Sequence, residues 1–364
     1  MSAPEKPEVT IRNARLDDKE GILRLLERAF GFPTDPDKWD WLYQRNQASS
    51  TYYCCIAESG GEIVAHYATI PVRFWHAGKE VPGLYSLDTA TDPDFQGRGL
   101  FRTLAEKLYA SAAHERNILT IFPNLQSAPG FYRKLACVEL TPFPVLVRPL
   151  GNLRPVVAAR QRALVPVAAV MDALALAGRA LPWLVKQRGR LGGAQVVRVA
   201  SFGPWADALW DDLKPLLGTC RVRDASYLQW RYCESPHTYT ILALDRGDGP
   251  VGFAVVGVRP WKGGATADLL ELMVRPDDRA GASLLVAEAL LLAARSGAVV
   301  LRTWASTRHP HRKAFRRALF GPLPARLKAD YSYGVRILDE TGVVPNELLH
   351  TDDWYISIGD VEYV

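Results

Sequence analysis

The chain has 364 residues, of which 48% are hydrophobic, so it can bury more than one apolar core. A formal net charge of +5 is modest for this length, and dispersed basic residues argue against a nucleic-acid-binding protein. Five cysteines without a Cys-x-x-Cys pair favour reduced thiols over disulfides or a metal site. Residues 1–7 lack the apolar core of a signal peptide, so we expect a cytoplasmic protein.

Hydrophobic periodicity predicts alternating strands and helices in the first part of the chain. A strand over residues 9–14 precedes a helix that begins at Asp17. Ser59-Gly60-Gly61 separates strands over 52–58 and 62–68, which predicts a hairpin. Further expected elements are strands over 72–76, 84–91 and 118–122, and helices over 100–115 and 127–135.

The stretch that links the strand over 84–91 to the helix over 100–115 has the composition of a phosphate-binding turn. It contains Gln96-Gly97-Arg98-Gly99, followed by Arg102 in the first helical turn. The first N–H groups of a helix have no partner within it, and the helix dipole favours an anion there. Glycines let the backbone approach a diphosphate closely, and the arginines add positive charge. The segment therefore predicts a pyrophosphate site.

This order of elements and this turn resemble the GNAT acetyltransferases. Their coenzyme A signature, Gln/Arg-x-x-Gly-x-Gly/Ala, matches residues 96–101, with Phe101 in place of the final small residue. The resemblance implies an α/β fold with a mixed, mostly antiparallel sheet flanked by helices, acetyl-CoA as co-substrate and direct acetyl transfer to a primary amine. The residues that it implies for cofactor binding are Ala90, Thr91, Gln96, Gly97, Arg98, Gly99, Leu100, Phe101, Arg102 and Asn124.

The resemblance also implies two catalytic residues. Tyr132 matches the family tyrosine that protonates the departing thiolate, with a core aromatic as the alternative. Asp88 is the expected base, and a structural carboxylate is its alternative. His66 is either a proton carrier or a satisfied core histidine. Asn124 either touches the cofactor or caps the helix over 127–135.

The chain contains an internal repeat. Pro93 and Pro276 are separated by 183 residues, and the same spacing relates Asp88 to Glu271 and Tyr132 to Phe315. We therefore expect two tandem GNAT-like domains, over 1–150 and 196–364. The region over 151–195 reads as a helical connector whose prolines and charges argue against membrane insertion.

The second repeat has lost the features of the phosphate turn. Arg279-Ala280-Gly281-Ala282 replaces the first signature, and Phe315 replaces the phenol. We expect acetyl-CoA in the N-terminal domain alone, although Arg275, Arg279 and Gly281 leave a second phosphate site open.

The acceptor is the least determined part of the prediction. The paired Trp-x-Tyr elements at 41–43 and 230–232 and the ending at 351–360 resemble tandem proteins encoded with surface-polysaccharide genes, which implies an amino sugar or another small polar amine. A non-catalytic CoA or metabolite sensor and a protein-lysine acetyltransferase are the alternatives. We expect no metal, and the sequence leaves open a homodimer.

Overall fold

The computed structural model describes residues 8–48, 50–140, 145–151, 165–177, 180–261, 264–306, 309–323, 332–338 and 353–361. These residues form two compact α/β units. Unit 1 comprises the described residues up to 140 together with 332–338, and unit 2 comprises those from 145 to 323 together with 353–361. The predicted fold, two tandem GNAT-like α/β domains, is confirmed.

Unit 1 is a mixed sheet with the strand order β1-β2-β3-β4-β5-β15-β6. Among these pairs β4 and β5 are parallel, and the others are antiparallel. The elements are β1 (Thr10–Asn13), η1 (Leu16–Asp18), α1 (Lys19–Phe30), α2 (Pro36–Tyr43), β2 (Cys54–Ser59), β3 (Glu62–His76), β4 (Lys79–Thr91), η2 (Pro93–Phe95), α3 (Leu100–Ala112), β5 (Ile118–Ile121), α4 (Ala128–Lys134), β6 (Val138–Leu140) and β15 (Tyr333–Ile337).

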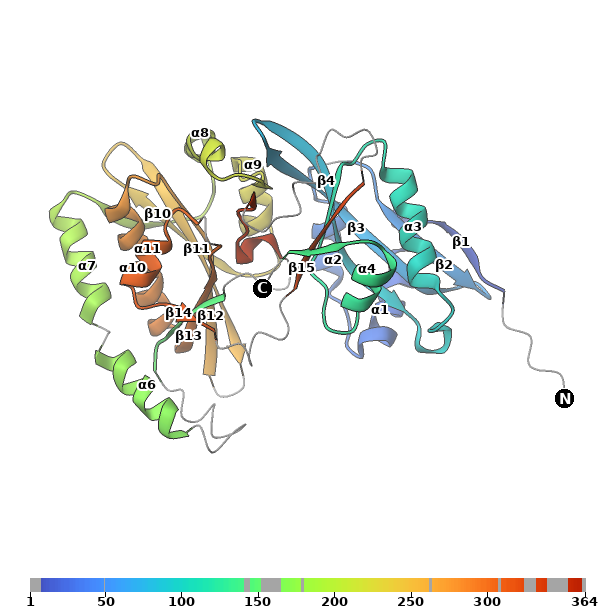
Figure 1. Cartoon of the computed structure of the whole chain (residues 1–364), viewed down its shortest axis with the longest axis horizontal. Coiled ribbons are helices and arrows are strands. Elements are labelled where there is room, and N and C mark those ends of the chain that lie inside the picture. The colour runs from blue at the N-terminus through green and yellow to red at the C-terminus, as the bar shows by residue number, and fades with distance from the viewer. Residues whose placement is uncertain are drawn as a thin grey trace. The chain divides into compact units, whose positions relative to one another are not determined.

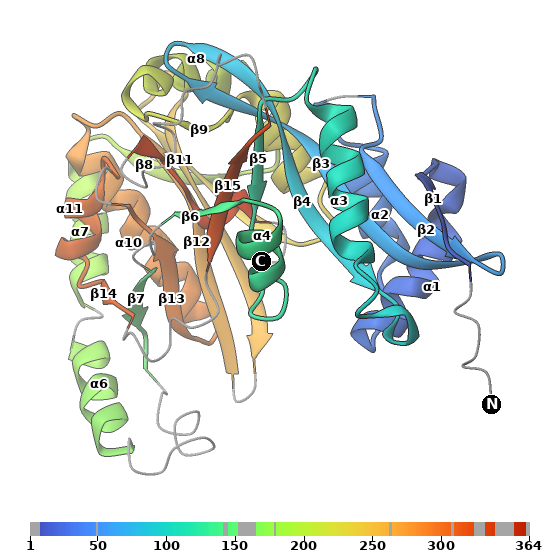
Figure 2. The ribbon, with the colours of Figure 1, turned by 45° about the vertical axis from the view of Figure 1, so that its right-hand side comes forward.

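Helices cover both faces of this sheet, with α1 on one face and α3 on the other (Figure 2). Successive side chains of a strand point to opposite faces, so Cys54 packs in the α1 core while Cys55 packs in the α3 core. The predicted strands over 62–68 and 72–76 form one continuous strand, β3, in which Pro71 pairs opposite Leu84. The helix predicted over 100–115 ends earlier, at Ala112.

Unit 2 repeats this arrangement with the strand order β14-β7-β13-β12-β11-β10-β8. Helix α10 packs on the sheet, and α7 lies against α10 (Figure 1). No described helix is long and apolar enough to cross a membrane. The elements are β7 (Val145–Pro149), α6 (Val165–Ala177), α7 (Ala180–Leu191), β8 (Gln195–Val199), α8 (Pro204–Leu213), η4 (Lys214–Leu216), β9 (Cys220–Arg221), α9 (Ala225–Leu228), η5 (Gln229–Cys233), β10 (Tyr239–Asp245), β11 (Pro250–Trp261), β12 (Gly264–Val274), α10 (Arg279–Arg295), β13 (Ala298–Trp304), α11 (Arg312–Arg317), β14 (Gly321–Pro322) and η9 (Ile358–Asp360).

The two repeats exchange one strand. Strand β7, from the N-terminal repeat, pairs antiparallel with β13 in unit 2, and β15, from the C-terminal repeat, pairs with β5 and β6 in unit 1. In Figure 2 the red β15 stands beside β5 and β6, and the green β7 stands beside the orange β13. The compact units therefore differ from the predicted ranges 1–150 and 196–364 at these two strands, and the described helices of the predicted connector 151–195, α6 and α7, belong to unit 2. Each exchanged strand pairs with the hydrogen-bonding edge of a strand from the other repeat, β7 with β13 and β15 with β5.

Candidate functional site

The site in unit 1 begins where β4 separates from β5. Their parallel pairing runs from Gly83 opposite Ile118 to Ser86 opposite Ile121, but β4 continues to Thr91. Beyond Ser86 the other edge of β4 stays paired with β3, through a β-bulge at Asp88. Asp88 has a φ of 47°, which is rare for a residue with a side chain. The bulge changes the direction of β4 just before its unpaired edge reaches Ala90 and Thr91.

A buried network fixes this bulge. His66 Nδ1 lies 2.9 Å from the Asp88 carbonyl oxygen, and His66 Nε2 lies 3.0 Å from Cys54 Sγ. Because a carbonyl only accepts, Nδ1 carries the proton and Nε2 accepts from the thiol. Burial lowers the pKa of His66 and raises that of Cys54, so both groups stay neutral. His66 is thus a satisfied core histidine, which is the second of the two predicted alternatives.

The Asp88 carboxylate has its own partner. The Tyr43 hydroxyl donates to Asp88 Oδ2 at 3.0 Å, and the carboxyl group is largely buried. Unit 2 repeats the arrangement, because the Tyr232 hydroxyl donates to Glu271 Oε1 at 3.1 Å. The two Trp-x-Tyr elements therefore supply the tyrosine that holds the carboxylate at the bulge of each unit.

The glycine turn, residues 96–99, has the geometry of an anion site. Gly97 and Gly99 adopt φ values of 76° and 79°, in the left-handed region that favours glycine. Gly99 is the N-cap of α3, and no side chain caps the helix there. The first N–H groups of a 13-residue helix are therefore left for a ligand. Leu100, the first helical residue, is buried and anchors the start of α3 in the core.

Three polar side chains surround this turn. Arg98 donates to the Asp94 carbonyl at 3.1 Å and lies 4.3 Å from the centre of the Phe95 ring. Arg102 pairs with Glu106 at 2.7 Å on the exposed side of α3. Gln96 Nε2 donates to the Thr91 carbonyl at 3.4 Å and so ties the turn to the end of β4.

Phe101, which departs from the signature, fills an aromatic cluster. Its ring centre lies 5.2 Å from that of Phe131 on α4 and 5.8 Å from that of Tyr67 on β3. A Cβ atom at Gly130 would lie 2.8 Å from Phe101 Cε1. The large residue on α3 is thus accommodated by a glycine on α4, and its backbone still begins the helix.

An unpaired polar atom marks the same end of β4. Thr89 Oγ1 is buried and has no hydrogen-bond partner among the described residues. A buried hydroxyl without a partner is costly, so a ligand group that bonds to it would stabilise the site. Together with the open edge at Ala90 and Thr91, this atom fits an amide-bearing chain such as pantetheine, while the α3 N-terminus fits its diphosphate.

Tyr132 contacts a residue that sequence reasoning missed. Its hydroxyl is hydrogen-bonded to Ser332 Oγ, and Ser332 donates its own proton to Glu139 Oε1 at 2.8 Å. Tyr132 therefore donates to Ser332. Burial raises the pKa of Tyr132 to about 12, so the phenol is protonated at neutral pH. The exchanged strand β15 follows Ser332, and a Cβ atom at its Gly334 would lie 2.8 Å from the Tyr132 ring.

Asn124 lies in the turn between β5 and α4, before the N-cap residue Ser127. Its Oδ1 atom accepts hydrogen bonds from the Ser127 backbone N–H at 2.9 Å and from the Gln126 N–H at 3.0 Å. These contacts order the turn that leads into α4, but the N-cap of that helix is Ser127 and no described side chain caps it, so the predicted capping role of Asn124 is not observed. The side chain is exposed, and contact with the cofactor stays a prediction.

The corresponding region of unit 2 is closed at the helix. Asp278 accepts from the Gly281 N–H at 2.8 Å, and Arg246 holds the same carboxylate at 2.7 Å. A Cβ atom at Gly281 would lie 2.4 Å from Leu244, so this glycine serves packing. A carboxylate of the protein thus occupies the place that an anion takes at a free helix N-terminus.

The slot of unit 2 is filled as well. Strand β12 pairs with β13 only as far as Asp268, and the segment 353–361 packs on the continuing strand. The Tyr355 hydroxyl donates to Met273 Sδ at 3.7 Å, and Ser357 donates to Glu271 at 2.8 Å. A capped helix and a filled slot are consistent with the expectation that CoA binds in the N-terminal domain alone, which stays a prediction.

Known proteins share a domain family with the first part of this chain and a fold with most of it. The family model described as Acetyltransferase (GNAT) domain matches residues 10–137. A GCN5-related N-acetyltransferase from Anabaena variabilis ATCC 29413 has a TM-score of 0.62 and 13% identity, covering 91% of this chain and 73% of that one. One from Kribbella flavida has a TM-score of 0.60 and 17% identity, covering 93% and 73%. No curated protein matches the sequence.

An N-myristoyltransferase from Saccharomyces cerevisiae, solved with bound myristoyl-CoA and inhibitors, is also similar. Its TM-score is 0.59 at 12% identity, covering 92% of this chain and 81% of that one. At these identities the likenesses to solved structures establish the fold, and the family model identifies the N-terminal domain. Residues 10–137 therefore match the GNAT acetyltransferase domain, and the chain has the α/β fold of these solved structures in two tandem units.

Proposed function

We propose that the chain is an N-acetyltransferase that moves an acetyl group from acetyl-CoA to a small polar primary amine. The observation that carries the proposal is the start of α3, which has two left-handed glycines and no capping side chain. It lies directly after the strand whose edge is open beyond Ser86. The likeness to an N-myristoyltransferase solved with myristoyl-CoA supports an acyl-CoA ligand for this fold.

In this proposal the N–H groups at the start of α3 bind the diphosphate, with Arg98 and Arg102 adding positive charge. Gln96 holds the turn against Thr91, and the β4 edge at Ala90 and Thr91 bonds to the pantetheine amides. The same edge aligns the thioester beside the bulge at Asp88.

The proposed chemistry is direct transfer. The amine nitrogen attacks the thioester carbonyl carbon, a C–N bond forms, and the C–S bond breaks. Asp88 accepts the proton that the nitrogen loses, while the Tyr132 hydroxyl donates a proton to the departing sulfur. The Tyr132 phenolate then takes the hydroxyl proton of Ser332, and Ser332 regains a proton from solvent at the exposed Glu139. A raised pKa keeps the phenol in the form that can donate.

One active site per chain follows from the contrast between the units. Asp278 caps α10, and the Tyr355 segment packs on β12. Neither feature has a counterpart among the described contacts of α3 and β4. The acceptor class, an amino sugar or similar amine, rests on the resemblance of the Trp-x-Tyr elements and of the ending at 351–360 to surface-polysaccharide proteins.

A binding experiment tests the site. Calorimetry with CoA should give one site per chain, and the double variant Gln96→Ala/Arg98→Ala should weaken binding at least tenfold. The matched control is Arg275→Ala/Arg279→Ala, which removes two arginines at the start of α10 and should leave the affinity unchanged. Two sites per chain, or equal affinities for the two double variants, would contradict the proposal.

An activity experiment tests the chemistry. Thiol release from acetyl-CoA is measured with amino sugars, polyamines and lysine peptides, for the native chain and for Tyr132→Phe. Turnover with an amino sugar supports the proposal, and labelled acetyl found only on lysine peptides would assign the chain to protein acetylation. CoA binding without turnover on any amine would indicate a sensor.

A further inference from the structure

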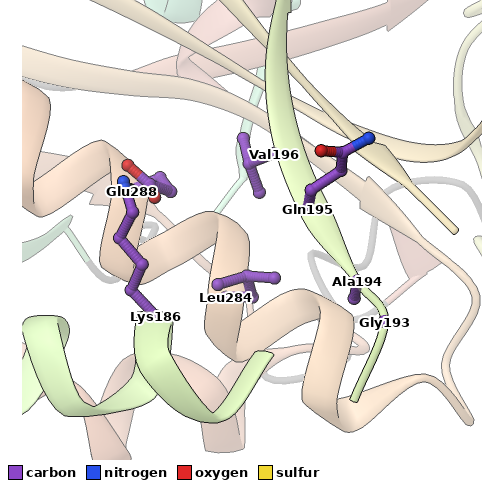
Figure 3. A pocket seen from close by; sticks show the side chains of 7 residues that line it. All are labelled: Lys186, Gly193, Ala194, Gln195, Val196, Leu284 and Glu288. Atoms are coloured by element: carbon purple, nitrogen blue, oxygen red, sulfur yellow. Dashed lines mark ion pairs between the residues drawn. The ribbon is translucent and has the colours of Figure 1, made fainter. Parts of the chain in front are cut away.

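Unit 2 contains cavities between α10 and the elements that cover it. One, of about 390 Å³, lies where α7 meets α10 and β8 (Figure 3). In Figure 3 Lys186 of α7 and Glu288 of α10 point toward each other, and Lys186 Nζ lies 2.5 Å from Glu288 Oε1. The partly buried charges of this contact are paired, and they attach α7 to α10.

Two neighbouring cavities differ in their charge balance. They have volumes of about 330 and 280 Å³, and both are lined by Arg148, Pro182 and Leu290. Leu181, Val185, Ala287 and Ala314 make most of the first wall apolar, with Ser283 and Arg317 as its other polar residues. No carboxylate lines either cavity within the described residues.

Arg148 lies in the apolar layer itself. Alternate residues of a strand share a face, and both Leu146 on β7 and Leu150, which directly follows β7, belong to the core cluster packed with α10. The residue is 7% exposed, and within the described part of the chain no hydrogen bond or ion pair of its guanidinium is found, while the guanidinium nitrogens are not fully enclosed. Residues 152–164, which follow in the sequence, contain no aspartate or glutamate.

The repeat provides an internal comparison. Arg336 is the counterpart of Arg148, since Val335-Arg336 on β15 matches Val147-Arg148 on β7. Arg336 donates to the Leu135 carbonyl, and its guanidinium lies 4.9 Å from the centre of the Tyr109 ring. An unpaired buried charge is strongly unfavourable, so burial lowers the pKa of Arg148. Arg336 therefore has partners within the protein, whereas the counterpart Arg148 is available to an external anion.

We propose that the Arg148 cavity of unit 2 binds a small apolar monocarboxylate. A planar carboxylate matches the guanidinium fork with two hydrogen bonds, and one negative charge neutralises the one buried positive charge. The apolar walls accommodate an alkyl or aromatic body. A cavity of about 330 Å³ is at the lower end of the range for small-molecule sites, which limits the ligand to a short chain or a single ring.

The test titrates sodium octanoate into the full chain by calorimetry, in the presence of saturating CoA so that an acyl site in unit 1 does not contribute. We expect one site, an affinity that rises about fourfold for each CH₂ from butanoate to octanoate, and much weaker binding of 1-octanol and octylamine. Octanoate that binds no tighter than 1-octanol would overturn the proposal.

Variants locate the site. Arg148→Met should weaken octanoate binding at least tenfold and leave 1-octanol unaffected, whereas the exposed control Arg198→Met should change neither. Val185→Trp, which fills the cavity from α7, should abolish binding of both. Unchanged octanoate affinity in Arg148→Met would contradict the assignment.

Thermal unfolding without ligand gives an independent measurement. Replacing an unpaired buried charge with an apolar side chain should leave the Tm of Arg148→Met equal to or higher than that of the native chain. Arg336→Met should have a lower Tm than the native chain, because this variant loses the contacts of Arg336 with the Leu135 carbonyl and the Tyr109 ring. A Tm of Arg148→Met that falls as far as that of Arg336→Met would show that Arg148 already has its partners, and the proposal would fail.

Discussion

Two glycines with the same backbone conformation allow a decisive test of the phosphate turn. Gly99, at the start of α3, has a φ of 79°, and Gly78, in the turn between β3 and β4, has a φ of 84°. A Cβ atom added at either position meets no other atom within 4 Å. Alanine at each site therefore introduces the same left-handed strain, about 1–2 kcal/mol, and no clash.

The two variants should differ in ligand binding. Gly78→Ala strains a hairpin remote in sequence from the helix start, so CoA affinity should be unchanged. Gly99→Ala relieves its strain by rotating the peptide that begins α3, which turns an N–H away from the diphosphate. One hydrogen bond to a charged group contributes about 1.5–3 kcal/mol, so the Kd for CoA should rise roughly 10- to 150-fold.

Calorimetric titration with CoA and urea unfolding of both variants measure the two quantities separately. We expect a similar loss in the free energy of unfolding for both and a loss of affinity for Gly99→Ala alone. If both variants lose stability and both bind CoA as the native chain does, the α3 N-terminus does not hold the diphosphate, and the proposed site is wrong.

Three further predictions follow from contacts within the units. Gly130→Ala should lower the Tm, because its Cβ would lie 2.8 Å from Phe101. Adding Phe101→Leu should restore part of this loss, and a double variant whose change in Tm equals the sum of the two single changes would refute the contact. Ser332→Ala should reduce kcat for acetyl transfer more than KM and shift the basic limb of the pH–rate profile, if it supplies the proton of Tyr132; an unchanged profile argues for a structural role. Burial lowers the pKa of His309 to about 3, and the positive charges of His311, Arg223 and Arg312 add to this effect. The folded state therefore favours the neutral imidazole, which contributes stability above about pH 6.5, the usual pKa of histidine. This contribution to the free energy of unfolding is lost as the pH falls towards 3. Urea unfolding should therefore show a shallower pH dependence for His309→Phe than for the native chain over that interval, and parallel curves would contradict the assignment.

The sequence was informative where chemistry is local. A turn that holds Gly97 and Gly99 needs left-handed residues, and both have positive φ. Adjacent cysteines on a strand must face opposite sides, and Cys54 and Cys55 do. The repeat was visible because many anchors share one spacing.

Other features could not be predicted, because they depend on partners distant in the chain. Ser332 is 200 residues from Tyr132, and nothing in its sequence context indicates a contact. The role of Phe101 required its pairing with Gly130 across two helices. The Trp-x-Tyr elements were noticed as a repeated pattern, but only the structure shows that Tyr43 bonds to Asp88.

The strand exchange had no sequence signal for a related reason. An alternating apolar pattern predicts that a segment joins a sheet, but it does not indicate whether β7 and β15 pair with β5 or with β13. The similarity that reveals the repeat is thus the same property that conceals which sheet each strand completes.

The exchange also explains why a unit with a filled slot is retained. The C-terminal repeat supplies β15, and with it Ser332 at the Tyr132 hydroxyl and Gly334 beneath the Tyr132 ring. A chain that ended after the N-terminal repeat would lack β15, the strand that pairs with β5, and would lack Ser332, the hydrogen-bond partner of the proposed acid. In return, β7 carries Arg148 into the core of unit 2. Each repeat therefore contributes a side chain to a proposed site of the other unit, so we expect the second repeat to be needed although it lacks the CoA signature.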